Sequence, residues 1–219
     1  MPIIAIVRPG CTGFDEQSRI QGNLDLPLND RGRDQLAATI TQLQPWPLDA
    51  LLTSRLDPAR TTAESIGEEL QVSVRFHEDL RNVDQGLWQG LSLDEIRRTS
   101  PKVLKQWQES PETVRPPEGE TIQEALARAL KVLEKPLKRE ESIAVVTSEP
   151  LATLLGCAIT ATQPEFDSVA GCCCSEDLVA IYSTNGRLPR TDPKQPWRTM
   201  SATGSLLTFS ETHGGRQNG

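Results

Sequence analysis

A run of five apolar residues leads into an arginine and a turn in the stretch Ile3-Ile4-Ala5-Ile6-Val7-Arg8-Pro9-Gly10. A continuous apolar run of this length, ended by polar and turn residues, is typical of a buried strand. It is too short to span a bilayer, and the residues around it lack the basic start and cleavage site of a signal peptide. We therefore expect residues 3–7 to form a buried strand of the core.

Similar apolar runs recur along the chain and alternate with segments that have helical spacing. Further strands are expected at Leu51–Thr53, Val72–Phe76, Ile143–Thr147, Leu178–Tyr182 and Leu206–Phe209. Helices are expected after the capping residues Asn29, Ser92 and Thr121, over Ala59–Leu70, and from Pro101 onward. Strands that alternate with helices favour a three-layer α/β/α sandwich around a mainly parallel sheet.

Three finer expectations concern helix ends and helix surfaces. Glu124 and Arg128 have the i,i+4 spacing of an ion pair on one helix. Pro136 is expected to end or kink that helix. The sequence Ser148-Glu149-Pro150 is expected to start another helix, with the serine as its cap.

Length, charge and cysteine content limit the class of protein. The 219 residues favour one domain over residues 1–210, followed by a disordered tail over 211–219. A net charge of -7 argues against binding to nucleic acid or to an anionic membrane. Five cysteines without a secretion signal indicate reduced thiols and a cytoplasmic protein.

Motifs for nucleotide, metal and nucleophile chemistry are scarce. The sequence has neither a Gly-rich nucleotide loop nor a Gly-x-Ser-x-Gly elbow, and the histidines are limited to His77 and His213. The run Cys172-Cys173-Cys174 lacks the spacing of a metal site. We therefore expect no metal and no cofactor.

Several segments match one family in the right order along residues 3–150. They are Ile6–Thr12, Arg19–Asn29, Ser54–Ala63, Leu80–Gly90, Pro117–Thr121 with Arg128, and Val145–Ser148. Together they resemble the motifs of the histidine phosphatase superfamily, whose members are phosphoglycerate mutase-like. The resemblance implies a phosphoglycerate mutase-like fold and a phosphate site at the strand ends.

In that family a histidine accepts the phosphoryl group, an acid donates a proton, and two arginines and a second histidine surround the phosphate. The resemblance places Arg8 at the first arginine. It places Pro9 at the nucleophile, Pro58 at the second arginine, Asn82 at the acid and Ser148 at the second histidine. Proline has no nucleophilic side chain, and loss of a nucleophile alone lowers the rate by up to about a million-fold.

The remaining candidate residues define a remnant cleft. Asp15 replaces an asparagine that contacts phosphate in the family, and Glu149 replaces a glycine, so both are expected to add negative charge. Arg19, Arg60 and Arg81 are candidates to reach a bound anion beside Arg8 and Ser148.

Three hypotheses follow from these replacements. The leading one is a catalytically inactive relative with a binding, scaffolding or regulatory role, whose partner is an unidentified protein or small molecule. The second is a sensor that binds a phosphorylated or other small molecule in the cleft. The third is an enzyme of altered chemistry, a phosphoric-ester hydrolase or mutase that uses Cys11 or Ser148 as nucleophile.

Overall fold

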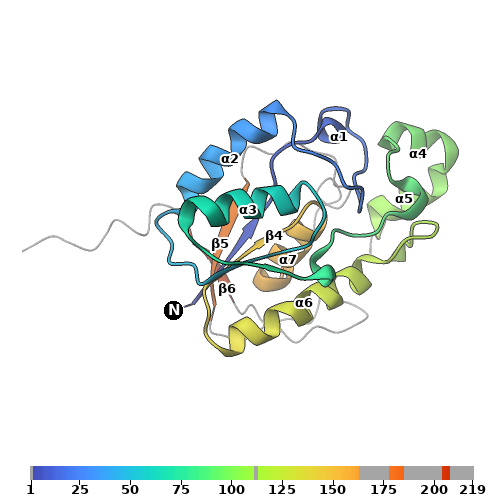
Figure 1. The fold of residues 1–219 in the computed structure, drawn as a ribbon. Coiled ribbons are helices and arrows are strands. Elements are labelled where there is room, and N and C mark those ends of the chain that lie inside the picture. Colours follow the sequence, from blue (N-terminus) through green and yellow to red (C-terminus); the bar gives the residue numbers. More distant parts are fainter. Residues whose placement is uncertain (1, 111–112, 163–177, 185–203, 208–219) are drawn as a thin grey trace, which may run out of the picture.

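The computed structural model describes residues 2–110, 113–162, 178–184 and 204–207, which form a six-stranded sheet covered by helices (Figure 1). The strand order is β3-β2-β4-β1-β5-β6. The strands are β1 Ile3–Val7, β2 Ala50–Thr53, β3 Val74–Phe76, β4 Ile143–Val146, β5 Val179–Thr184 and β6 Gly204–Leu207. Within the described ranges no helix has the length and apolar content needed to cross a membrane.

The centre of the sheet is parallel and one edge is antiparallel. Strand β4 pairs in parallel with both β1 and β2, and β2 pairs in parallel with β3. Strand β5 runs antiparallel to β1 and to β6. The carboxyl ends of β1, β2 and β4 therefore lie together at one end of the sheet. Open α/β sheets bind ligands beyond the carboxyl ends of their strands.

Helices cover both faces of the sheet, as the sequence predicts. Helices α2 and α3 lie on one face and α6 and α7 on the other, while α4 and α5 lie beyond one end of the strands (Figure 1). The helices are α1 Gly13–Glu16, α2 Asp30–Leu43, α3 Ala59–Leu70, α4 Leu93–Thr99, α5 Pro101–Glu109, α6 Ile122–Lys138 and α7 Leu151–Thr160. Short 3₁₀ turns cover Glu78–Leu80 and Gly86–Trp88.

The alternation of side chains along β1 explains the three layers. Ile3, Ala5 and Val7 belong to the core cluster that also contains residues of α3, and Ile4 and Ile6 belong to the cluster of α6 and α7. Successive strand residues point to opposite faces, so an apolar run places apolar side chains on both faces. The sheet is buried on both sides for that reason.

Helix caps confirm most of the predicted helix starts. The side chain of Asn29 accepts a hydrogen bond from the backbone N–H of Gly32 at 2.8 Å. Ser92 and Thr121 each form a capping box with the acidic residue three positions later. These bonds satisfy amides at the helix start that have no partner inside the helix.

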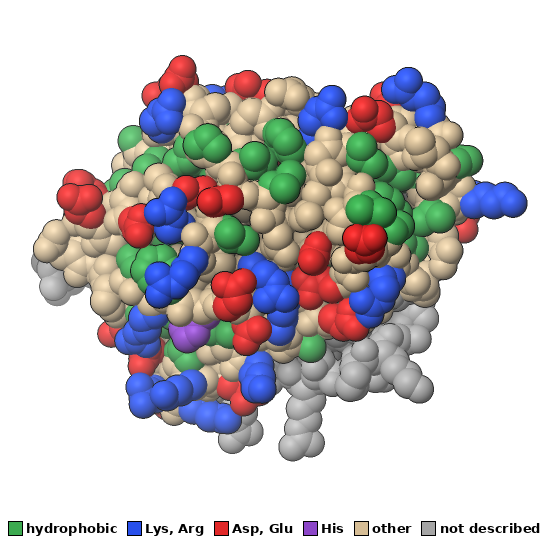
Figure 2. Space-filling view, turned by 45° about the vertical axis from the view of Figure 1, so that its right-hand side comes forward, with side chains coloured by type: hydrophobic (Ala, Val, Ile, Leu, Met, Phe, Trp, Pro, Cys, Tyr) green, Lys and Arg blue, Asp and Glu red, His purple; other side chains and the backbone are tan. Residues whose placement is uncertain are grey.

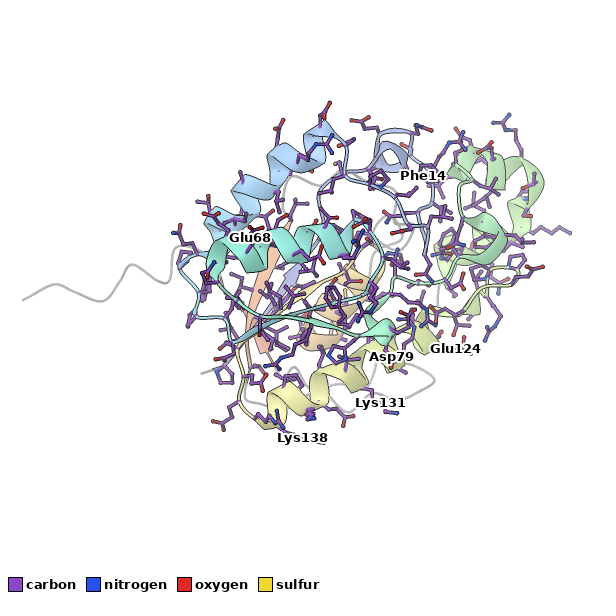
Figure 3. The ribbon with its side chains drawn as sticks, viewed as in Figure 1. Phe14, Glu68, Asp79, Glu124, Lys131 and Lys138 are labelled. Atoms are coloured by element: carbon purple, nitrogen blue, oxygen red, sulfur yellow. The ribbon has the colours of Figure 1, made fainter. Side chains whose placement is uncertain are left out.

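The predicted ion pair between Glu124 and Arg128 is wrong. Glu124, labelled on the first turn of α6 in Figure 3, pairs with Arg115 at 2.5 Å, and Arg128 pairs with Glu120 at 2.5 Å. Arg115 and Glu120 both precede α6, so the two pairs tie the helix to the loop before it. Spacing along one helix cannot reveal such partners.

The start of α7 also differs from the prediction. Pro150 occupies the cap position without a side-chain bond, and the Ser148 hydroxyl accepts a hydrogen bond from Gln21 instead of capping the helix. The acidic residue at the helix start is confirmed, because Glu149 accepts from the backbone N–H of Thr153 at 3.1 Å. Helix α6 ends at Lys138, two residues after Pro136.

Some predictions fall on parts of the chain that the structure does not describe. Cys172, Cys173 and Cys174 lie there, as do His213, the end of the predicted strand at Phe209, and the tail over residues 211–219.

Candidate functional site

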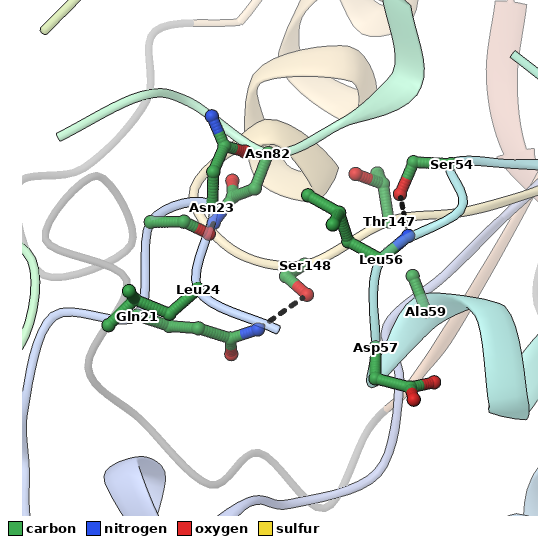
Figure 4. A pocket seen from close by; sticks show the side chains of 11 residues that line it. Gln21, Asn23, Leu24, Ser54, Leu56, Asp57, Ala59, Asn82, Thr147 and Ser148 are labelled. Atoms are coloured by element: carbon green, nitrogen blue, oxygen red, sulfur yellow. Dashed lines mark hydrogen bonds between the residues drawn. The ribbon is translucent and has the colours of Figure 1, made fainter. Parts of the chain in front are cut away.

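A pocket opens at the sheet edge where β2 and β4 end (Figure 4). It holds about 220 Å³ of space free of protein atoms, with open solvent included. We call it the polar pocket. Its lining residues are Gln21, Gly22, Asn23, Leu24, Ser54, Leu56, Asp57, Ala59, Asn82, Thr147 and Ser148.

Beside the polar pocket, Arg8 forms an ion pair with Glu149. The pair joins Arg8 Nε to a carboxylate oxygen of Glu149, whose side chain is only 10% exposed. The Glu149 carboxylate also accepts from the hydroxyl of Thr153 at 2.9 Å, and that hydroxyl accepts from Arg8 at 3.3 Å. Arg8 is thus already paired with an anionic group of the chain itself.

The side-chain amide of Asn82 forms three hydrogen bonds with neighbouring backbone groups. Its Nδ2 donates to the carbonyl of Gly22 at 3.1 Å and to that of Glu149 at 2.6 Å. Its Oδ1 accepts from the backbone N–H of Leu151 at 3.3 Å. An amide can do this because it both donates and accepts, whereas an ionised carboxylate only accepts.

A second clamp holds the loop that carries Asn82. Arg128, whose side chain is 12% exposed, donates to the backbone carbonyls of Arg81 at 2.7 Å and Asn82 at 2.8 Å while it pairs with Glu120. It also donates to the carbonyl of Asp79 at 2.7 Å. Asn82 is therefore fixed from both its backbone and its side chain.

Polar groups inside the pocket are only partly satisfied. Gln21 donates to the Ser148 hydroxyl at 3.4 Å (dashed in Figure 4), and the Ser54 hydroxyl accepts from the backbone of Leu56 at 3.4 Å. The side-chain oxygen of Asn23 is buried and accepts no hydrogen bond from the described residues. A buried polar atom without a partner is unusual and calls for a functional or structural explanation.

Asp57 is the charged residue of the lining, and it is paired. It accepts from Arg60 at 2.5 Å and from the hydroxyl and the amide of Thr61 at 2.6 and 3.1 Å. Burial alone would raise the pKa of Asp57, but the bonds from Thr61 and Arg60 outweigh burial and lower that pKa. The same pairing raises the pKa of Arg60. Pro58 follows and caps α3 without a side-chain bond.

The other predicted cleft residues are Asp15, Arg19 and Arg81, and their partners do not belong to the lining of the polar pocket. Asp15 forms a capping box with Thr12 at α1, and burial raises the pKa of Asp15 although the bonds from Thr12 oppose this. Arg19 donates to the carbonyl of Gly90 at 2.6 Å and to Glu95 at 3.1 Å. Arg81 donates to a carbonyl of its own turn at 3.5 Å.

Charge at the molecular surface is mixed. Figure 2 shows basic and acidic side chains interspersed over the face that it displays. Among the described residues no group of three or more His, Cys, Asp or Glu side chains could hold a metal ion.

A comparison with protein-family models decides the family. The model of the histidine phosphatase superfamily (branch 1) matches residues 4–190, which is most of the chain. The chain belongs to the histidine phosphatase superfamily.

Relatives in this superfamily are named as phosphatases or as phosphoglycerate mutases. Phosphoserine phosphatase 1 of Hydrogenobacter thermophilus is 27% identical over 71% of this chain and 75% of its own length. Glucosyl-3-phosphoglycerate phosphatase of Mycobacterium tuberculosis is 33% identical over 67% of this chain and 61% of its own length. The structure of the mycobacterial enzyme with VO3 has a TM-score of 0.74 over 95% of this chain and 99% of that chain, at 23% identity. That structural likeness shows the fold.

The structure brings some of the predicted cleft residues together and leaves others apart. Asn82 and Ser148 line the polar pocket, and Arg8 and Glu149 lie together beside it. Arg60 does not line the pocket but pairs with the lining residue Asp57. The roles of Gln21, Asn23 and Ser54 in the lining were missed, although these residues lie in the segments that match the family motifs. Thr153, which holds both Arg8 and Glu149, has no sequence signal beyond its position four residues after Glu149.

Proposed function

We propose that the chain is a catalytically inactive histidine phosphatase-like protein that acts by binding, as a scaffold or regulator. The pairing of Arg8 with Glu149 is the observation that carries this proposal. A phosphate dianion would have to displace the carboxylate from Arg8 and then lie beside it. Like charges held together in a partly buried site are costly, so binding of a dianion is disfavoured.

The positions of the nucleophile and the acid support the same conclusion. Pro9 has no group that can attack phosphorus. Asn82 cannot act as an acid, and its side chain already makes three hydrogen bonds to backbone. Its replacement of a carboxylic acid therefore serves structure, and nothing in its bonding leaves it available to a leaving group.

The two alternative nucleophiles are poorly placed for attack on phosphorus. Ser148 is bonded by the amide of Gln21, which cannot take up a proton at neutral pH. Cys11 is buried, and it does not belong to the lining of the polar pocket. A hydroxyl or thiol needs a nearby base or a cationic surrounding to become a strong nucleophile. Enzyme chemistry on phosphate esters, as in the relatives, is therefore the weaker proposal.

The cysteines support a proposal for the compartment. Cys11 and Cys157 form no disulfide in the described part of the chain. Thiols kept reduced favour the cytoplasm, so we propose a cytoplasmic protein.

Turnover of p-nitrophenyl phosphate and of a panel of phosphate esters tests the proposal. We expect the purified protein to show no more turnover than its Arg8→Ala variant, because a trace contaminant would act equally in both preparations. A rate that is present in the unmodified protein and lost in Arg8→Ala would show a working phosphatase and would overturn the proposal. A Pro9→His/Ser148→His/Glu149→Gly variant is the matched attempt to restore the site.

A further inference from the structure

Leu87 is the large apolar side chain that stays exposed among the described residues. It is 60% exposed, although it lies in the turn Gly86–Trp88 directly before the buried Trp88. An exposed leucine is common on protein surfaces and has no meaning by itself. The support and the charges around Leu87 decide whether it can act as a binding residue.

The turn that carries Leu87 is tied to the loop before α6. The backbone N–H of Leu87 donates to the carbonyl of Pro117 at 2.9 Å. Asp84 joins the same two segments, because its carbonyl accepts from the N–H of Glu120 at 3.0 Å and its own N–H donates to the Glu120 carboxylate at 2.9 Å. A Cβ atom at Gly86 would lie 2.0 Å from the Pro117 carbonyl oxygen, so the two backbones are in direct contact. Leu87 is therefore presented on a fixed support, and a preorganised group loses less conformational entropy on binding.

The segments 84–88 and 116–120 also carry acidic groups without a counter-charge. The arginines that contact these segments are already neutralised, since Arg115 and Arg128 each pair with a glutamate at 2.5 Å. Neither Asp84 nor Glu118 forms an ion pair with a described residue. Glu118 is exposed, and so is Pro117 before it. The surface beside Leu87 is therefore apolar with an acidic border.

We call the surface formed by Asp84, Leu87, Pro117 and Glu118 the Leu87 patch. None of these residues lines the polar pocket. An apolar surface bordered by carboxylates is complementary to a basic amphipathic helix, which has an apolar stripe beside Lys or Arg side chains. An acidic helix would instead meet charge of its own sign.

We propose that the Leu87 patch docks a basic amphipathic helix of a partner protein. The apolar stripe of that helix packs on Leu87 and Pro117, and its cations lie beside Glu118 and Asp84. The inference goes beyond the proposed function, because it assigns a surface and a kind of partner that a binding role alone does not specify.

Backbone amide shifts in an NMR titration test the proposal with three synthetic peptides. The first is an amphipathic helix of Leu and Lys, and the second has Glu in place of every Lys. The third has the Leu/Lys composition in an order that forms no apolar face. A protein with a net charge of -7 attracts cationic peptides in general, and the third peptide measures that attraction. We expect saturable shifts centred on residues 84–88 and 116–120 from the Leu/Lys helix alone.

Two variants test the side chains of the patch. Leu87→Ser removes the apolar contact, and we expect it to weaken binding of the Leu/Lys helix at least about tenfold. Its melting temperature should not change, because Leu87 is mostly exposed. Glu118→Gln removes one carboxylate, and we expect binding about two- to threefold weaker at low salt, with a smaller difference at high salt.

Glu68→Gln is the matched control for Glu118→Gln. Glu68, labelled on α3 in Figure 3, is exposed and forms no ion pair with a described residue, but it does not belong to the Leu87 patch. We expect Glu68→Gln to bind the Leu/Lys helix as tightly as the unmodified protein.

The outcomes distinguish this inference from the proposed function. Absence of saturable binding of the Leu/Lys helix, equal binding of any two of the three peptides, equal binding by Leu87→Ser and the unmodified protein, or shifts centred on α3 would each overturn the docking surface. None of these results involves turnover, so the non-catalytic proposal would stand. Phosphatase activity lost in Arg8→Ala would overturn the non-catalytic proposal and leave the docking surface in place.

Discussion

Two ion pairs, Arg128 with Glu120 and Arg8 with Glu149, are each linked to Asn82 by a hydrogen bond. Arg128 donates to the Asn82 carbonyl, and the Asn82 amide donates to the Glu149 carbonyl. The first pair has side chains 12% and 14% exposed, and the second has side chains 32% and 10% exposed. Chemically the two pairs are alike, but their surroundings give them different roles.

Arg128 is surrounded by backbone carbonyls, whereas Arg8 contacts groups that an anion could replace. The three carbonyls around Arg128 belong to one loop, so that arginine fixes the position of the loop. Arg8 contacts the carboxylate of Glu149 and the hydroxyl of Thr153. The difference teaches that two similar ion pairs in segments that match the family can have different roles, one holding backbone carbonyls and the other pairing an arginine with a carboxylate of the same chain.

Removal of Arg128 should have the largest effect of any substitution at these two ion pairs. Arg128→Ala leaves Glu120, whose side chain is 14% exposed and also accepts from the backbone N–H of Asp84, without its arginine, and it takes that donor from three carbonyls. We expect a loss of about 3–5 kcal/mol in the free energy of unfolding. Urea unfolding followed by circular dichroism measures it.

Arg33→Ala is the control, because Arg33 pairs with Asp30 at the surface, where the side chains are 61% and 98% exposed. An exposed pair contributes about 0–1 kcal/mol. Equal losses in the two variants would show that the loop does not depend on Arg128.

Removal of charge from Glu149 should act mainly on anion binding. Glu149→Gln keeps a side-chain oxygen for Thr153 but frees Arg8 from its carboxylate, so we expect the affinity for inorganic phosphate to rise at least about tenfold. The measurement is the phosphate-dependent rise in melting temperature at constant ionic strength.

Glu141→Gln is the matched control for that variant. Glu141 pairs with Arg75 at 2.6 Å and precedes the amino end of β4, whereas Glu149 follows its carboxyl end. Phosphate binding that is equally strong in both variants, or absent from Glu149→Gln, would show that Glu149 does not guard Arg8.

Local sequence patterns predicted the fold well because they report on local physics. The apolar run at Ile3–Val7 and the caps at Asn29 and Thr121 depend on neighbouring residues, and the structure has those elements at those places. The family resemblance predicted a phosphoglycerate mutase-like fold, which the family match and the structural likeness confirm. It also identified Arg8, Asn82 and Ser148 as residues near one site.

Contacts between distant segments were beyond the reach of those patterns. The bond of Ser148 to Gln21 spans 127 residues, and the clamp of Arg128 on the Asn82 carbonyl spans 46. Helical spacing suggested Glu124 as the partner of Arg128, but the fold brings Glu120 and the loop carbonyls closer. For the same reason the lining of the polar pocket by Asn23 and Ser54 could not be derived from spacing.

The smallest predicted effect concerns Asp15, a carboxylate whose donors belong to Thr12 instead of an arginine. Hydrogen bonds of 2.6 and 2.7 Å join it to the amide and hydroxyl of Thr12, yet burial keeps the pKa of Asp15 above its usual value. A carboxyl with a raised pKa binds more protons in the folded state, so its stabilising contribution is complete below the unfolded pKa and is lost as pH rises through the folded pKa.

Asp15→Asn removes this dependence of stability on pH. We expect the variant to gain on the unmodified protein in unfolding free energy as pH rises through and above the usual titration range of a carboxyl. A constant difference as pH rises would mean that folding does not raise the pKa of Asp15.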